Sequence, residues 1–282
     1  MVRLSRVCVF ASLWLVAQPA RAYLIDLNDA RAVDPGTVEL ELQPAGYYQT
    51  LLGEEEHYVI APSAQLYLGL AEGWDVLYVT RGYALLDEPD GEPAYTLREQ
   101  FIGVRRVLVA GAYNDEDLEG PSLAVQAGAF LPGAGAEPGV GASLALLFAW
   151  QTDLGALHAN VWFNYTQDET FNSFGSLAVE GPPDWPVRPV AELYVEVEDD
   201  EPFVSGLIGA VADVSDEFAV QGGVRVGAWQ DYAELEVRLS TWVYWDAFSA
   251  GDEDSPDELS ASSSARRAQE PRSRFAAGEA GR

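Results

Sequence analysis

The sequence contains no lysine, so its cationic side chains are arginines apart from two histidines. Acidic residues outnumber basic ones by 45 to 16, which gives a formal net charge of −29. Binding of nucleic acid requires a basic surface that neutralises phosphates, so this balance excludes nucleic acid as a partner. Genomic base composition and solubility can each explain the acidity. The functional explanation is an acidic interior that favours cations.

Cysteine is nearly absent, because Cys8 is the only one in the chain. It lies in an N-terminal stretch with the parts of a secretory signal peptide: Arg3 and Arg6, an apolar core, and the cleavage sequence Ala20-Arg21-Ala22. The apolar core is too short to span the roughly 30 Å of bilayer hydrocarbon, which argues against a retained helix. We therefore predict that residues 1–22 are removed, which leaves no disulfide and no cysteine-based metal site.

Beyond this leader no apolar run is long enough for a transmembrane helix, but a two-residue alternation recurs along most of the chain. It is clearest from Tyr232 to Trp245, where alternate positions are apolar and most intervening ones carry charges or hydroxyls. This period predicts an extended strand with two unlike faces. Its length suits a tilted membrane-spanning strand of about 9–11 residues better than a soluble strand of about 5–6 residues.

The same pattern predicts about twelve strands, at residues 37–49, 58–70, 74–86, 97–110, 123–131, 141–151, 155–166, 170–180, 187–198, 203–214, 218–228 and 232–245. The predicted fold is therefore all-β. Short connections and an even strand number predict an antiparallel up-and-down transmembrane β-barrel. Closure of the barrel removes exposed strand edges. The barrel occupies residues 37–248, after an N-terminal lead-in at residues 23–36. Residues 249–282 lack a hydrophobic period and are predicted to form a disordered tail.

The inward positions of this barrel are its candidate functional residues. Alternation places on the lumen side Glu39, Glu41, His158, Asn160, Asn164, Arg188, Glu192, Glu196, Arg225, Glu234, Glu236 and Arg238. If the last strand pairs with the first, we expect the last strand's two glutamates to come near Glu39 and Glu41. Gathered carboxylates would concentrate cations in an open channel, whereas pairing with arginines would plug so narrow a lumen. The sequence leaves both interpretations open.

The sequence contains no recognisable catalytic arrangement. Hydrolysis by a serine needs a histidine within hydrogen-bond reach of the hydroxyl. The mature chain offers only His57 and His158, and neither has the spacing to serine that is used by outer-membrane lipases and lipid A deacylases. Acidic loops at residues 54–56 and 115–119 lack the spacing of a calcium-binding loop. We predict no enzyme, no cofactor and no metal site.

The order of the strands resembles a family of bacterial outer-membrane barrels that are labelled transporter-like or meta-pathway phenol-degradation proteins. The likeness is carried by AVQAGAFLPG (124–133), ALHANVWFNY (156–165), VAELYVEVE (190–198) and FAVQGGVRVG through RLSTWVYW (218–245). The family's usual Pro-Thr-Gly is here Pro132-Gly133, and a tail follows the aromatic end of the last strand that the barrel-insertion machinery reads. The resemblance implies an outer-membrane location, passage of small, often hydrophobic compounds, and no catalytic residues.

We therefore expect an outer-membrane protein, exported with a cleaved signal peptide, that works as a passive channel or transporter-like protein for small hydrophobic or cationic solutes. The expected partners are outer-membrane lipid and lipopolysaccharide, the barrel-assembly machinery and a small-molecule solute. One alternative is a structural or ligand-binding barrel without transport. Another is a soluble secreted β-sandwich, in which charges would interrupt the apolar positions at mid-strand.

Overall fold

The computed structural model describes residues 28–52, 57–85, 95–115, 118–132, 139–167, 169–198, 201–215, 217–229 and 232–247. The predicted signal peptide and C-terminal tail lie outside the described residues. Within the described ranges, no helix is long and apolar enough to cross a membrane.

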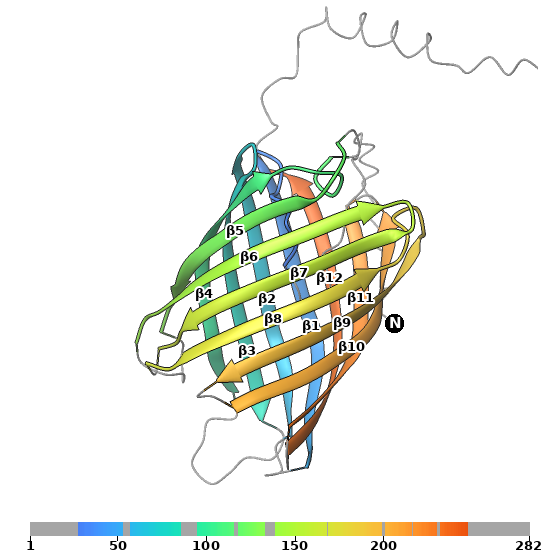
Figure 1. The fold of residues 1–282 in the computed structure, drawn as a ribbon. Helices are drawn as coiled ribbons and strands as arrows, with labels where there is room; N and C mark the ends of the chain where they lie inside the picture. The colour runs from blue at the N-terminus through green and yellow to red at the C-terminus, as the bar shows by residue number, and fades with distance from the viewer. Residues whose placement is uncertain are drawn as a thin grey trace, which may run out of the picture. The chain divides into compact units, whose positions relative to one another are not determined.

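Twelve antiparallel strands close into one barrel, which confirms the predicted fold (Figure 1). The strands are β1 (Thr37–Leu52), β2 (His57–Ala71), β3 (Trp74–Leu85), β4 (Tyr95–Val109), β5 (Ser122–Phe130), β6 (Gly141–Thr152), β7 (Gly155–Tyr165), β8 (Phe171–Glu180), β9 (Val187–Glu198), β10 (Glu201–Ser215), β11 (Phe218–Trp229) and β12 (Tyr232–Asp246). Each strand pairs with its neighbours in sequence, and β1 pairs with β12 to close the barrel. The strands are strongly tilted, as closure of a barrel requires.

The connections follow from local turn chemistry. Gly73 has a φ of 67°, a left-handed conformation that suits glycine, and it completes the tight turn between β2 and β3. This turn lies at the end of the barrel where β1 begins, which we call the N-terminal end. The β4–β5 connection lies there too, and the β7–β8 connection lies at the opposite, far end.

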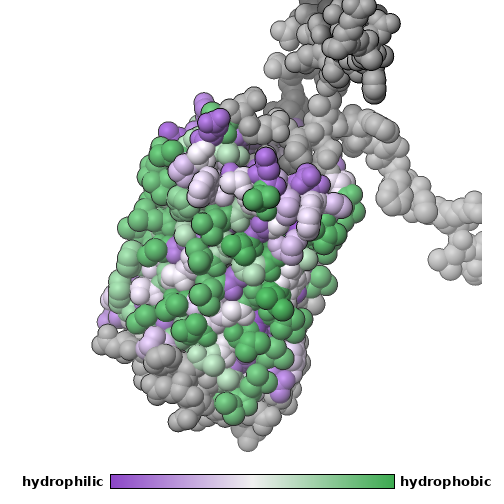
Figure 2. All heavy atoms as spheres, turned by 45° about the vertical axis from the view of Figure 1, so that its right-hand side comes forward, coloured by the Kyte–Doolittle hydropathy of each residue, from purple (hydrophilic) through white to green (hydrophobic). Residues whose placement is uncertain are grey.

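The outer surface of the barrel is apolar. On β6, Leu144 and Leu146 are each 47 % exposed, whereas the alternating Ala145 and Leu147 are fully buried. Figure 2 shows apolar side chains over much of the visible wall and polar ones gathered near one end. A contiguous apolar surface of this kind needs a non-aqueous environment. The soluble-sandwich alternative is wrong, because the sheet is closed and its apolar faces point outward.

The inner wall is not wholly polar. Leu77, Leu147 and Leu207 are buried inside, and Trp242 packs there against Tyr67 with ring centroids 6.2 Å apart. A lumen of this width is filled in part by side chains. Apolar positions therefore occur on both faces of several strands.

Candidate functional site

The structure places all twelve candidate lumen residues on the inner wall. Nine are buried: Glu39, Glu41, His158, Asn160, Arg188, Glu192, Glu234, Glu236 and Arg238. Asn164, Glu196 and Arg225 are half-buried. They do not form one ring, because the strand tilt spreads them between the two ends of the barrel.

Arginines and carboxylates pair at two levels of the lumen. On β11 and β12, Arg225 lies 3.0 Å from Glu234 and 3.1 Å from Glu236, and Glu236 also accepts a hydrogen bond from Arg238. These pairs offset the negative charge of the two β12 glutamates, which would otherwise attract cations.

Toward the N-terminal end, Arg188 bridges Glu180 and Asp213, so β8, β9 and β10 are tied together. His158 Nε2 lies 3.6 Å from Glu180 Oε2. Neither ring nitrogen of His158 makes a hydrogen bond with the described residues. The structure also gathers no group of three or more potential metal ligands within its described ranges.

The expected cluster of four glutamates is wrong. The closing ladder is antiparallel, so Glu41 near the start of β1 faces Trp242 near the end of β12. Glu236 near the start of β12 faces Tyr48 near the end of β1. Glu41 instead accepts hydrogen bonds from the amides of Gln65 and Gln221, at 2.8 and 2.9 Å.

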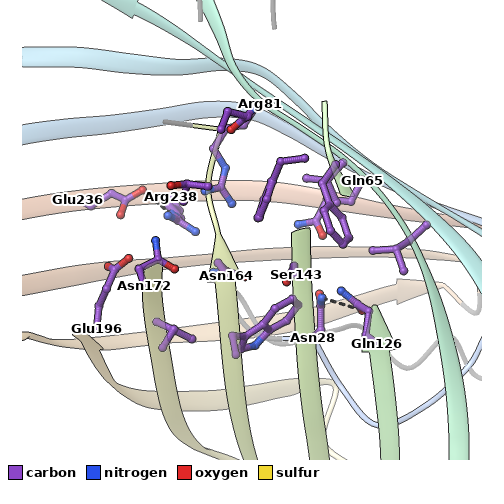
Figure 3. A pocket seen from close by; sticks show the side chains of 18 of the residues that line it. Asn28, Gln65, Arg81, Gln126, Ser143, Asn164, Asn172, Glu196, Glu236 and Arg238 are labelled. Atoms are coloured by element: carbon purple, nitrogen blue, oxygen red, sulfur yellow. Dashed lines mark hydrogen bonds and ion pairs between the residues drawn. The ribbon is translucent and has the colours of Figure 1, made fainter. Parts of the chain in front are cut away.

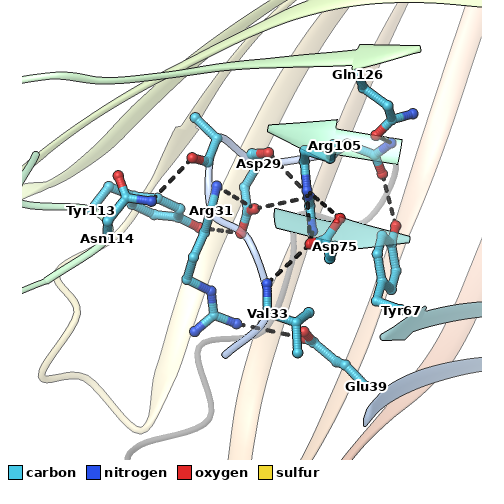
Figure 4. Close-up of polar contacts among 12 residues, drawn as sticks. Asp29, Arg31, Val33, Glu39, Tyr67, Asp75, Arg105, Tyr113, Asn114 and Gln126 are labelled. Atoms are coloured by element: carbon cyan, nitrogen blue, oxygen red, sulfur yellow. Dashed lines mark hydrogen bonds and ion pairs between the residues drawn. The ribbon is translucent and has the colours of Figure 1, made fainter. Parts of the chain in front are cut away.

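Residues 28–34, which we call the lumen segment, lie inside the barrel near its N-terminal end. Asp29 is fully buried and lies against Arg105 of β4, which is also fully buried (Figure 4). Arg105 Nη2 lies 2.6 Å from Asp75 Oδ2, and Arg105 Nη1 lies 3.5 Å from Asp29 Oδ1. Asp75 also accepts a 3.0 Å hydrogen bond from the backbone N–H of Val33. One arginine thus joins the lumen segment to the wall.

Asn28 fixes the start of the lumen segment to three strands. Its side chain accepts a hydrogen bond from Tyr67 of β2 at 3.1 Å and donates one to Gln126 of β5 at 3.3 Å. Asn160 of β7, a predicted lumen residue, donates a 2.6 Å hydrogen bond to the carbonyl of Asn28. Contacts on three sides place this segment across the lumen.

The β4–β5 connection holds the segment from the N-terminal end. Tyr113 donates a 3.0 Å hydrogen bond to Asp29, and Asn114 donates a 3.1 Å bond to the carbonyl of Ala30. Burial, together with the negative charge of Asp29, raises the pKa of Tyr113 well above its ordinary value. Tyr113 therefore stays protonated and remains a donor at neutral pH.

A cavity of about 470 Å³ lies on the far side of the lumen segment (Figure 3). Asn28 lines it at one end, and Thr166 and Gln167 of the β7–β8 connection line it at the other. Phe101 and Phe130, whose ring centroids are 5.3 Å apart, contribute to an apolar part of its lining. The lumen is therefore closed by protein toward the N-terminal end and hollow beyond.

The cavity also carries polar atoms that make no hydrogen bond with described residues. They are Ser143 Oγ, Asn164 Oδ1, Asn172 Oδ1 and Gln126 Nε2. Polar groups shielded from bulk solvent normally have a partner. Water or a polar solute in the cavity would supply it.

The lumen segment was not expected from the sequence, which indicates only a polar lead-in at residues 23–36. The sequence nevertheless contains a signal for a buried partner, because Asp75 and Arg105 are charged residues within predicted strands. Arg105 and Arg106 are adjacent in this strand, so alternation alone does not tell which of the two faces inward. The structure resolves it, since Arg105 is buried inside and Arg106 stacks over the exposed Trp74 outside, 5.0 Å from its ring.

These features can be compared with known proteins. Over its entire length, the COG4313 outer membrane channel from Pseudomonas putida F1 superposes on 79 % of this chain, with a TM-score of 0.59 and 8 % identity. The chain has the fold of an outer-membrane channel. The CymD monoaromatic hydrocarbon channel matches with a TM-score of 0.45 and 10 % identity, over 76 % of this chain and 89 % of its own. No protein-family model matches the sequence, and no curated protein matches it.

Proposed function

We propose that the protein is an outer-membrane channel for small neutral solutes. The observation that carries this proposal is a closed barrel with an apolar outer surface and a cavity of about 470 Å³ in its lumen. Sites for small molecules typically have volumes of about 300–1,000 Å³, so the cavity accommodates one such solute.

The lining of the cavity favours a neutral solute over a cation. It contains three arginines, Arg81, Arg225 and Arg238, against the carboxylates Glu196 and Glu236. This lining has no excess of negative charge with which to concentrate cations. Aromatic rings beside amide and hydroxyl groups suit a molecule that has an apolar face and a few hydrogen-bonding groups.

The lumen segment closes the axial path toward the N-terminal end. Asp29 and Ala30 are fully buried within the barrel, so a solute in the cavity meets them before it reaches that end. Axial passage therefore requires residues 28–34 to move. The contacts that hold them include side-chain hydrogen bonds and the ion pairs Arg105–Asp29 and Arg31–Glu39, which can break without unfolding of the strands.

We further propose that the leader is cleaved after Ala22 and that the barrel-assembly machinery inserts the barrel in the outer membrane. The apolar wall would contact membrane lipid, and the far end would contact lipopolysaccharide. Because the number of strands is even, the first strand begins and the last strand ends on the same side of the membrane, which is the periplasm in outer-membrane barrels. The far end then faces outward.

Swelling of proteoliposomes tests the proposal. The mature protein is reconstituted, and swelling is followed in isotonic solutions of small neutral polyols or of amino acids of either charge and similar size. We expect swelling above that of protein-free liposomes, faster with the neutral solutes. No swelling above the protein-free control would contradict a channel, and a preference for cations would contradict the assigned solute class.

A further inference from the structure

The part of the cavity wall that β5 to β8 form carries polar side chains without charge. Ser143 on β6, Asn164 on β7 and Asn172 on β8 line the cavity there, together with Gln126 on β5 (Figure 3). The charged residues of the lining lie on other strands, namely β3, β9, β11 and β12. We call Gln126, Ser143, Asn164 and Asn172 the neutral wall.

Strand pairing places three of these side chains next to one another. Ser143 is the ladder partner of Asn164, and Asn164 is the ladder partner of Asn172. Direct partners on one face of an antiparallel pair have Cβ atoms about 4.5–5.5 Å apart. The three side chains therefore form a continuous row across β6, β7 and β8. Hydroxyl groups across a six-membered ring are separated by a similar distance.

The neutral wall presents hydrogen-bonding atoms that the described residues leave without a partner. They are Oδ1 of Asn164 and of Asn172, Oγ of Ser143 and Nε2 of Gln126. Gln126 and Ser143 are only 1 % and 6 % exposed, and polar groups so shielded from bulk solvent normally have a partner. That partner must donate to the two asparagine oxygens and accept from the Gln126 amide. A hydroxyl group does both.

An aromatic ring borders the row. Trp162 lies two residues before Asn164, on the same face of β7, and it lines the cavity. Its ladder partners are the small Ala145 and Phe174, which also lines the cavity. The C–H face of a sugar or cyclitol ring is apolar and packs on aromatic rings. The wall therefore combines a surface for such a ring with groups that bind its hydroxyls.

A hydrocarbon or an ion suits this wall less well. A hydrocarbon would leave the asparagine oxygens and the Gln126 N–H unpaired, which is costly for shielded groups. A site built to bind hydroxyl groups rejects analogues that lack them. An ion would meet no opposite charge on the neutral wall itself.

We infer that the neutral wall is a binding site for a small uncharged cyclic polyol, such as a monosaccharide or a cyclitol. The inference rests on the proposed channel function and adds the class of solute. The ring packs beside Trp162. Its hydroxyl groups donate to Asn164 and Asn172 and accept from Gln126, and Ser143 can donate or accept.

Binding of myo-inositol tests the site. Equilibrium dialysis is carried out with the radiolabelled compound and the mature protein, in a detergent that has no sugar headgroup. Cyclohexanol has the same ring with a single hydroxyl and serves as the comparison competitor. We expect saturable binding of one myo-inositol per chain, which unlabelled myo-inositol displaces and cyclohexanol at the same concentration does not. Absence of saturable binding would show that water alone partners these atoms and would overturn the site, as would displacement by cyclohexanol.

Two serine variants form a matched pair. Ser143 and Ser176 both carry a hydroxyl oxygen that makes no hydrogen bond with the described residues, but Ser143 lines the cavity and Ser176 does not. Ser143→Ala should weaken binding about two- to tenfold, and Ser176→Ala should leave it unchanged. Asn164→Leu removes both amide groups at similar volume and should weaken binding by at least about tenfold. A heat-dependent shift in electrophoretic mobility shows that each variant is folded. Wild-type affinity in folded Ser143→Ala and Asn164→Leu would overturn the site.

Swelling of proteoliposomes in myo-inositol separates the site from the channel. Swelling without saturable binding leaves the channel standing and removes only the site. Saturable binding without swelling above the protein-free control supports the site and contradicts the channel.

Discussion

Arg105 is fully buried between two carboxylates, and the position of the lumen segment depends on it. A buried charge is costly unless it is paired and hydrogen-bonded. Arg105 satisfies Asp75 through Nε and Nη2, and it meets Asp29 through Nη1. Each of the three side chains therefore depends on the other two.

Asp75→Asn should destabilise the protein by about 3–5 kcal/mol, because it leaves Arg105 buried with only one carboxylate partner. The free energy of unfolding in urea, measured in detergent micelles, checks this. Asp213→Asn is the matched control, since Asp213 also pairs with an arginine but its side chain is 27 % exposed. Solvent weakens the contribution of that ion pair to stability, so we expect a smaller loss in the free energy of unfolding. Equal losses would contradict the account.

Tyr113 gives the lumen segment a defined response to alkaline pH. Its pKa in the folded protein lies above the unfolded value of about 10. The unfolded chain therefore releases this proton first, so stability is fully present below pH 10 and falls as pH rises beyond it. We expect wild type to lose more stability between pH 9 and pH 11 than Tyr113→Phe, measured by urea unfolding. The same loss in both proteins would contradict the buried contact with Asp29.

At the scale of elements, the lumen segment packs directly on the backbone of β2. Just after the segment, the N–H of Gly36 donates a 3.0 Å hydrogen bond to the carbonyl of Gly69. A Cβ added at Gly69 would lie 1.9 Å from the carbonyl oxygen of Asp34, so only glycine permits this approach. By contrast, a Cβ at Gly175 on β8 would meet its nearest neighbour at 4.0 Å.

Gly69→Ala should therefore displace the lumen segment, while Gly175→Ala should leave it in place. A thiol introduced as Ala30→Cys reports the displacement, because Ala30 is fully buried and the predicted mature chain has no cysteine of its own. We expect a maleimide reagent to label this thiol slowly in the parent and in the Gly175→Ala background, and rapidly with Gly69→Ala. Equal labelling in all three would show that the segment does not depend on this contact.

The strands were predictable from the sequence, whereas the lumen segment was not. A two-residue period over a dozen residues is a local signal, and the bounds of β9, for example, agree with the predicted residues 187–198. The lumen segment is held by partners remote in sequence, such as Asn160, which is 132 residues from Asn28. Charges within strand segments, such as Asp75 and Arg105, signal that a buried partner exists, but no local pattern tells which residues supply it. The same limit explains the wrong glutamate cluster, since the pairing of Glu41 with Trp242 is a matter of long-range register.

At the scale of the whole molecule, closure and an apolar exterior define the protein. Every strand has two partners, and the exposed surface carries rows of leucine, valine and aromatic side chains. Such a barrel is stable in detergent because no strand edge is open to denaturant. We expect a difference in electrophoretic mobility between unboiled and boiled samples of the outer-membrane fraction. A soluble periplasmic protein without a shift would contradict the membrane barrel.

The central claim is that this barrel is a channel whose axial path is closed from within by residues 28–34. Single-channel conductance in planar bilayers tests it most directly, with the mature wild type compared with a variant that lacks these residues. The account predicts small or rare openings for the wild type and a larger, steady conductance for the deletion variant. The deletion removes the segment that fills the lumen between the cavity and the N-terminal end of the barrel. Equal conductance in the two proteins would contradict the claim.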